Sequence, residues 1–209
     1  MIVELVGPPG SGKSTILKEI VKQNKKFIAE SEVPINFLSF YVIYTLIFLS
    51  LKYFITFRIY KLNELKTNLY YFQNFVKKFL RLKIAVRNNL ILIQDDGLIS
   101  NTISSRALLN NKYLESYIFL KNQKYIVFKL VVPKSENLKR LNNKAISASW
   151  EKLKVTKTFS EIITSYSRIL DLEINIKNLK KYDVQIYEIE NVGSSVTVAE
   201  TILRLLDGK

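Results

Sequence analysis

A glycine-rich run that ends in Lys-Ser-Thr lies close to the start of the chain. Residues 7–15 match the phosphate-binding pattern G-x-x-x-x-G-K-[ST], the P-loop or Walker A motif, at every fixed position. An apolar pentapeptide precedes the run and a helical repeat of apolar residues follows it, so a chance glycine-rich turn is the weaker interpretation. The predicted nucleotide-binding loop consists of Gly7, Pro8, Pro9, Gly10, Ser11, Gly12, Lys13, Ser14 and Thr15.

This loop predicts ATP and Mg²⁺ as cofactors. Its backbone N–H groups would point at a phosphate, with the positive end of the following helix behind them. We expect Lys13 to reach the β- and γ-phosphates and Ser14 to offer its hydroxyl to Mg²⁺. Lys13 is therefore a predicted catalytic residue, and Ser14 is a predicted metal ligand.

Two adjacent acids follow the apolar residues 90–93 in the run Gln94-Asp95-Asp96-Gly97. Ligands of open α/β sheets bind beyond the carboxyl ends of the strands, so these acids should face the phosphates. We assign Asp95 to the Mg²⁺ side and Asp96 to the base that accepts the acceptor's proton, although the two roles could be exchanged. In the alternative interpretation, both acids only form a strand-end turn and cap the next helix.

A third pattern covers residues 131–144, where an apolar run leads through Pro133 into a basic helical stretch. Together with the first two patterns, it resembles the P-loop small-molecule kinases of the nucleoside monophosphate kinase type. The resemblance implies that Arg140 and Lys144 are lid cations that close over the transferring phosphate, with Lys139 a weaker candidate. The alternative is a solvated helix face. The start of the chain and the paired acids also look, more loosely, like kinase-like proteins of bacterial surface-polysaccharide gene clusters.

The resemblance covers about two thirds of the chain and leaves the acceptor open. The Asp-Arg-Tyr and Glu-Arg-Ser signatures of thymidylate and deoxynucleoside kinases are absent after residues 90–93. The Phe-Pro-Arg of adenylate kinases is absent after Gly97 as well. Arg106 lies on the expected following helix and is our candidate for binding the acceptor.

These residues require a parallel sheet to hold them. Apolar runs at 2–6, 90–93, 126–132 and 184–189 predict buried strands, and 27–29 is a further short candidate. Helices are expected at 16–22, 99–109, 135–143, 160–180 and 196–206. This alternation predicts one α/β domain over residues 1–209, with the P-loop NTPase fold: a central parallel sheet flanked by helices.

Residues 34–87 are too long for a compact crossover and predict a helical insertion between the second and third strands. Val33 to Leu51 is a run of nineteen residues without a charge, whereas residues 52–87 hold nine Lys or Arg against one Glu. We favour a helical cap buried against the core. Peripheral membrane contact through residues 33–87 is the second interpretation, and a transmembrane span is the third.

Composition narrows the chemistry further. The chain has no His and no Cys, which excludes disulfides, imidazole or thiolate metal sites and Ser-His-Asp triads. The net charge of +14 favours polyanionic partners. Met1 leads directly into apolar residues without a basic segment, so we expect no secretory signal and a cytoplasmic protein, with peripheral contact at the inner face of the membrane as the alternative.

Three function classes are consistent with these features to different degrees. The preferred one is an ATP- and Mg²⁺-dependent kinase acting on a small acceptor of the nucleotide or sugar class, with a membrane-associated kinase of a lipid-linked glycan as a variant. A P-loop ATPase or nucleic-acid-binding module that uses the basic insertion is the alternative. A regulatory GTPase is disfavoured because no Asn-Lys pair is followed by Asp two positions later.

Overall fold

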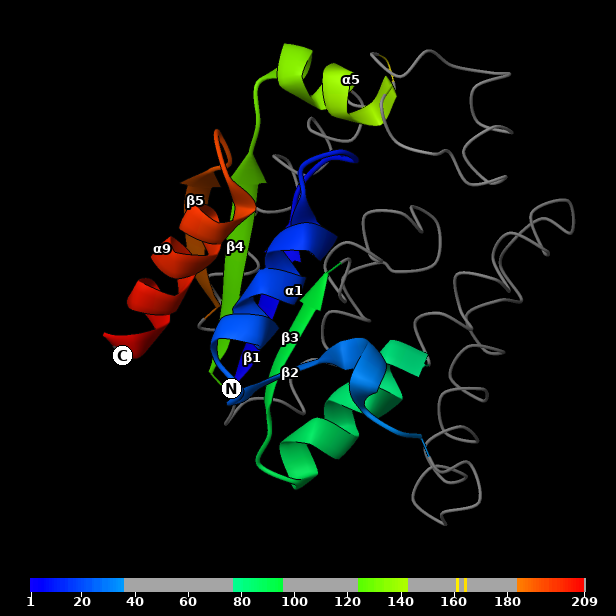
Figure 1. Cartoon of the computed structure of the whole chain (residues 1–209). Helices are drawn as coiled ribbons and strands as arrows, with labels where there is room; N and C mark the ends of the chain where they lie inside the picture. Colours follow the sequence, from blue (N-terminus) through cyan, green and yellow to red (C-terminus); the bar gives the residue numbers. More distant parts are fainter. Residues whose placement is uncertain (36–76, 96–123, 143–160, 162–163, 165–183, 209) are drawn as a thin grey trace, which may run out of the picture.

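The computed structural model describes residues 1–35, 77–95, 124–142 and 184–208, together with Glu161 and Thr164. Its centre is a sheet of five parallel strands in the order β2-β3-β1-β4-β5. All strands point the same way, so their carboxyl ends meet at one edge of the sheet (Figure 1). The strands are β1 (Ile2–Val6), β2 (Phe27–Ala29), β3 (Ile91–Asp95), β4 (Tyr125–Val131) and β5 (Gln185–Glu190).

The helices lie on the sheet and at its carboxyl edge. Helices α1 (Lys13–Gln23) and α9 (Ser195–Asp207) lie side by side on one face, while α5 (Lys134–Asn142) lies beyond the end of β4 (Figure 1). A short 3₁₀ helix, η1 (Glu30–Glu32), follows β2 directly. Residues 77–87 are helical and lead through a turn into β3. This arrangement brings the start of α1, the end of β3 and the start of α5 to the same edge.

The core on the α1 side of the sheet is formed by alternate residues of the strands. Val3 and Leu5 point to the same face because side chains alternate along a strand, and both are fully buried. They pack in one cluster with Ile16 and Ile20 of α1 and Ile202 of α9. All five residues of β1 are buried, since β1 is the central strand of a sheet whose opposite face also excludes solvent at these positions.

A buried polar cluster occupies the opposite face of β1 and β3. The Glu4 carboxylate, which is fully buried, accepts hydrogen bonds from the Tyr125 hydroxyl and from the Gln94 amide, the latter at 3.3 Å. The Gln94 amide nitrogen also donates to the Tyr125 oxygen at 3.0 Å. These bonds link β3 to β1 and β4 at the residue immediately before Asp95. They therefore fix the end of β3 beside the P-loop.

The α/β P-loop fold expected from the sequence is confirmed. Every strand predicted within the described residues is present, and the bounds of 2–6 and 27–29 are as expected. The other strand and helix bounds differ from expectation by one to three residues. Of the expected insertion at 34–87, the structure describes residues 34 and 35, which are irregular, and residues 77–87, which are helical. The nature of the remaining insertion stays a prediction, as do the helix expected at 99–109 and most of that expected at 160–180, because they lie outside the described residues.

The membrane interpretation also stays a prediction. Within the parts of the chain that the structure describes, no helix is both long enough and apolar enough to cross a bilayer.

Candidate active site

The P-loop wraps tightly between β1 and α1. Gly10 and Gly12 have φ angles of 81° and 84°, a left-handed conformation that glycine adopts without steric cost. The Ser11 N–H donates to the Pro8 carbonyl at 3.1 Å, and Gly12 then begins α1 by accepting from the Ile16 N–H at 3.0 Å. The first turn of α1 therefore opens directly onto the loop, the arrangement that favours anions at a helix N-terminus.

Lys13 curls back over the loop that precedes it. Its ammonium donates hydrogen bonds to the carbonyl oxygens of Gly7 at 2.8 Å and Pro8 at 3.3 Å, and only 9% of the residue is exposed. A cation held against the loop is available to phosphates bound there.

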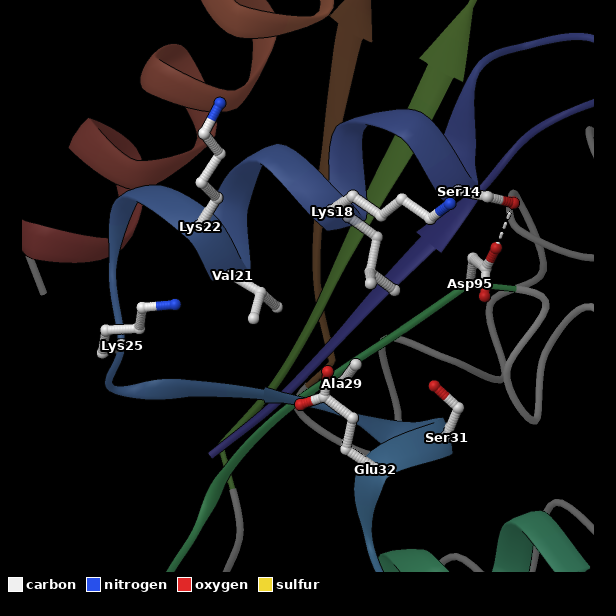
Figure 2. Close-up of a pocket in the computed structure, with 10 residues that line it drawn as sticks. Ser14, Lys18, Val21, Lys22, Lys25, Ala29, Ser31, Glu32 and Asp95 are labelled. Atoms are coloured by element: carbon white, nitrogen blue, oxygen red, sulfur yellow. Dashed lines mark hydrogen bonds between the residues drawn. The ribbon is translucent and has the colours of Figure 1, made fainter.

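Ser14 and Asp95 meet at the carboxyl edge of the sheet. Asp95 is the last residue of β3, and β3 pairs with β1, so its carboxylate lies beside the first turn of α1. The Ser14 hydroxyl donates a hydrogen bond to Asp95 Oδ2 (Figure 2). The structure thus brings together the two residues that the sequence assigned to the metal.

This pair of oxygen donors fits Mg²⁺, which prefers hard oxygen ligands and keeps several waters. Ser14 and Asp95 would hold a Mg²⁺ ion here through the hydroxyl oxygen and the carboxylate. The described residues contain no group of three or more acids that could form an all-protein cage.

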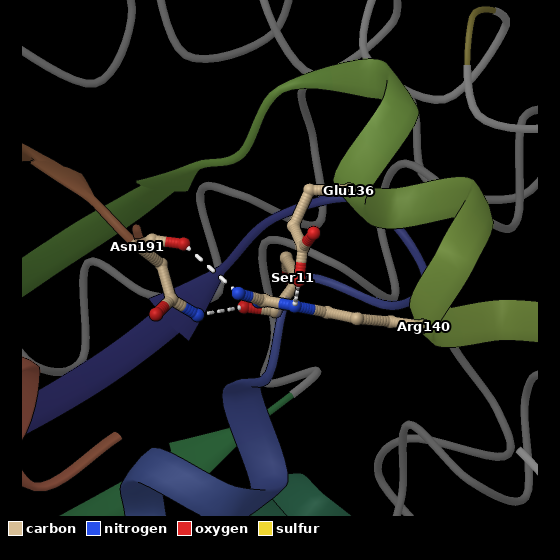
Figure 3. Close-up of polar contacts among 4 residues, drawn as sticks. All are labelled: Ser11, Glu136, Arg140 and Asn191. Atoms are coloured by element: carbon tan, nitrogen blue, oxygen red, sulfur yellow. Dashed lines mark hydrogen bonds and ion pairs between the residues drawn. The ribbon is translucent and has the colours of Figure 1, made fainter. Parts of the chain in front are cut away.

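Arg140 approaches the loop from α5, as Figure 3 shows. Its Nε donates to Glu136 Oε1 at 3.0 Å, and its Nη2 donates to the backbone carbonyl of Asn191 at 3.2 Å. The Asn191 amide in turn donates to the Ser11 carbonyl at 2.5 Å. Arg140 is thus anchored both on α5 and at the residue that follows β5 and contacts the P-loop.

Asn191 was not singled out by the sequence, although it occupies an informative position. It follows β5 directly, at the same edge as Asp95, and only 3% of it is exposed. A methyl group added at Gly12 would lie 2.7 Å from its amide nitrogen, so the absence of a side chain at Gly12 allows this contact. A polar residue immediately after a strand was the available signal.

An ion pair that the sequence analysis did not identify lies at the end of β2. Glu30 is buried, and its Oε1 accepts from Arg81 Nη1 at 2.8 Å. Lys78, one turn earlier on the same helix, donates to the Asp95 backbone carbonyl at 3.3 Å. Two cations of residues 77–87 therefore contact the ends of β2 and β3. The sequence signal for this site was Glu30, an acid that directly follows the predicted strand 27–29 and so lies at the same edge of the sheet as Asp95.

Four further residues were predicted to belong to the site, and none of them is placed in it by the structure. Lys139 is exposed on α5. Asp96, Arg106 and Lys144 lie outside the described residues, so their roles remain predictions.

The structure resembles solved kinase structures over almost its whole length. It matches two structures of deoxyadenosine kinase from M. mycoides, one with bound dATP (20% identity, TM-score 0.54, covering 99% of this chain and 100% of that one). The other holds the products dCMP and a flexible dCDP (19% identity, TM-score 0.56, 100% of both chains). Shikimate kinase from Acinetobacter baumannii in complex with shikimate also matches (16% identity, TM-score 0.50, 99% and 93% coverage).

No protein-family model matches the sequence, and no curated protein matches it either. At these identities, the structural likeness shows the fold alone, an α/β P-loop NTPase fold with a central parallel sheet. Function must therefore be argued from the site itself.

Proposed function

We propose that the protein is an ATP- and Mg²⁺-dependent kinase that transfers the γ-phosphoryl group to a small acceptor of the nucleotide or sugar class. The observation that carries the proposal is the contact between Ser14 Oγ and Asp95 Oδ2 beside the loop that holds Lys13. Metal ligand, phosphate-binding cation and phosphate loop then lie at one edge of the sheet. This is what phosphoryl transfer requires, since its catalysis is mostly positioning and charge neutralisation.

Each residue has a defined role in this proposal. When bound, ATP would supply the transferable phosphoryl group, and Mg²⁺ would supply positive charge that offsets the negative charge of the phosphates. Lys13, Arg140 and Lys144 neutralise charge on the phosphates, while Ser14 and Asp95 hold the metal. Asp96 accepts the proton of an acceptor hydroxyl as the acceptor oxygen bonds to the γ-phosphorus and ADP leaves. Arg106 binds the acceptor.

The acceptor class draws support from the structural neighbours. The similar structures are a deoxyadenosine kinase and a shikimate kinase, so this fold acts on a nucleoside in one case and on shikimate in the other. The acceptor panel therefore contains nucleosides, nucleotides, sugars and lipid-linked sugars, together with small hydroxy acids.

A screen for ADP release tests the proposal. ATP and Mg²⁺ are incubated with the protein and each panel member, and ADP is measured with and without acceptor. We expect acceptor-dependent ADP release that falls to below about a tenth in Lys13→Ala, because the γ-phosphate loses its contact with the ammonium. Lys26→Ala is the matched control, since Lys26 is exposed and lies outside the site.

The screen also separates the alternative functions. ADP release that is independent of any panel member but stimulated by DNA or RNA would favour the ATPase or nucleic-acid module. ADP release only with lipid-linked sugars would favour the membrane-associated kinase. Full activity of Lys13→Ala would contradict every one of these P-loop functions.

A further inference from the structure

A pocket of about 420 Å³ opens between α1 and the chain that follows β2 (Figure 2). Ser14 and Asp95 line one end, so the pocket is continuous with the predicted metal site. Its volume falls in the range of small-molecule sites, about 300–1,000 Å³. The pocket therefore lies where an acceptor could reach the transferring phosphate.

The α1 wall of this pocket carries a row of lysines. Ser14, Lys18 and Lys22 are spaced four residues apart, which stacks them on one side of the helix. Lys25 continues the lining just beyond the helix end. Lys18 lies one turn behind Ser14, about 6 Å along the axis, and Figure 2 shows its ammonium directed toward Ser14 and Asp95.

Among the described residues, no acid lies within ion-pairing distance of Lys18, the lysine nearest to Ser14 along this row. Lys18 forms no ion pair or hydrogen bond with any residue of the described parts of the chain, and its side chain is exposed. Lys22, by contrast, lies 3.9 Å from Glu19. The acids of the lining are Asp95, which is engaged with Ser14, and Glu32. With Asp95 engaged by Mg²⁺, the described lining would hold Lys18, Lys22 and Lys25 against Glu32 alone, so its net charge would be positive.

We infer that this pocket binds the acceptor through an anionic group, a phosphate or carboxylate, and that Lys18 is its counter-charge. The inference rests on the proposed kinase function and specifies its acceptor. An anionic acceptor must approach the negative triphosphate, and like charges at close range in a partly desolvated pocket repel strongly. A cation beside Ser14 offsets that repulsion. The Ser31 hydroxyl, which also lines the pocket, adds a hydrogen-bonding group opposite α1.

The test is a binding measurement on the whole protein with saturating ADP and Mg²⁺, which keep the P-loop occupied. Calorimetric titrations use neutral and anionic partners: deoxyadenosine with dAMP, glucose with glucose 6-phosphate, and methyl shikimate with shikimate. The first two pairs isolate a phosphate and the third isolates a carboxylate. The variants are Lys18→Gln and, as a matched control outside the pocket, Lys26→Gln.

We expect at least one anionic member to bind about tenfold or more tightly than its neutral partner, the usual size of a charge-assisted contact. Lys18→Gln should remove that preference, while Lys26→Gln should keep it. Neutral partners that bind as tightly as the anionic ones, an unchanged preference in Lys18→Gln, or no binding of any anionic member would overturn the inference.

The same experiment separates this inference from the proposed function. Lys18-dependent binding of an anionic compound that yields no ADP in the presence of ATP would keep the pocket and reject the kinase for that compound. Lys13-dependent ADP release with neutral acceptors alone would keep the kinase and reject the anionic acceptor.

Discussion

Gly12→Ala tests whether Asn191 is packed against the P-loop as the structure has it. The φ of Gly12 is 84°, and a Cβ there would lie 2.7 Å from Asn191 Nδ2, closer than real Cβ contacts come. The left-handed backbone costs a non-glycine residue about 1–3 kcal/mol. If the Asn191 amide is pushed away, the buried Ser11 carbonyl loses its hydrogen bond, which costs about 1–3 kcal/mol more.

The second cost can be isolated by a double-mutant cycle. Asn191→Ala removes the colliding amide, so in that background Gly12→Ala should cost only the backbone term. We expect an interaction free energy of about 1–3 kcal/mol between the two substitutions. The assay is urea unfolding at constant pH, with the free energy of unfolding extrapolated to water.

Gly10→Ala is the matched control for this cycle. Gly10 has a similar φ of 81°, but a Cβ there would meet Leu141 and Asn137 rather than Asn191. Its cost should therefore be the same with and without Asn191→Ala. Additive costs for Gly12→Ala and Asn191→Ala would refute the packing of Asn191 against the loop.

Three further predictions concern the metal, the buried cluster and pH. Asp95→Asn should raise the Mg²⁺ concentration for half-maximal ADP release at least about tenfold, measured by Mg²⁺ titration, because the metal loses a charged ligand. Tyr125→Phe should lower the free energy of unfolding by about 1–3 kcal/mol in urea titrations, because the buried Glu4 carboxylate loses a donor. Burial lowers the pKa of Lys83 from its unperturbed value of 10.5, so the unfolded chain binds that proton more tightly and the free energy of unfolding should rise with pH up to about that value. Lys83→Met should make this increase smaller, which can be measured as Tm at a series of pH values.

The P-loop and its flanking elements were predictable because their signal is local. The pattern at 7–15 sits between an apolar strand and an amphipathic helix, and each piece can be recognised without knowing the rest of the chain. Asp95 was predictable from a general rule, since acids at strand ends face the ligand in parallel sheets. Its contact with Ser14 additionally requires that β3 lie next to β1.

The missed residues depend on contacts between distant parts of the chain. Asn191 bonds to Ser11 across 180 positions, and Arg81 bonds to Glu30 across 51. Neither pair has a recognisable spacing, because packing of the strands brings the partners together. Lys18 lies on a helix that the sequence predicted. The sequence did not show which segment lies opposite this side of α1, so the pocket that Lys18 lines could not be predicted.

The most direct test of the kinase proposal follows the γ-phosphoryl group itself. ATP labelled on its γ-phosphate is incubated with Mg²⁺, the acceptor panel and either the wild-type protein or Lys13→Ala, and the labelled products are separated. The proposal predicts label in a phosphorylated panel member with the wild-type protein and almost none with Lys13→Ala. Label released only as inorganic phosphate, or equal transfer by both proteins, would contradict it.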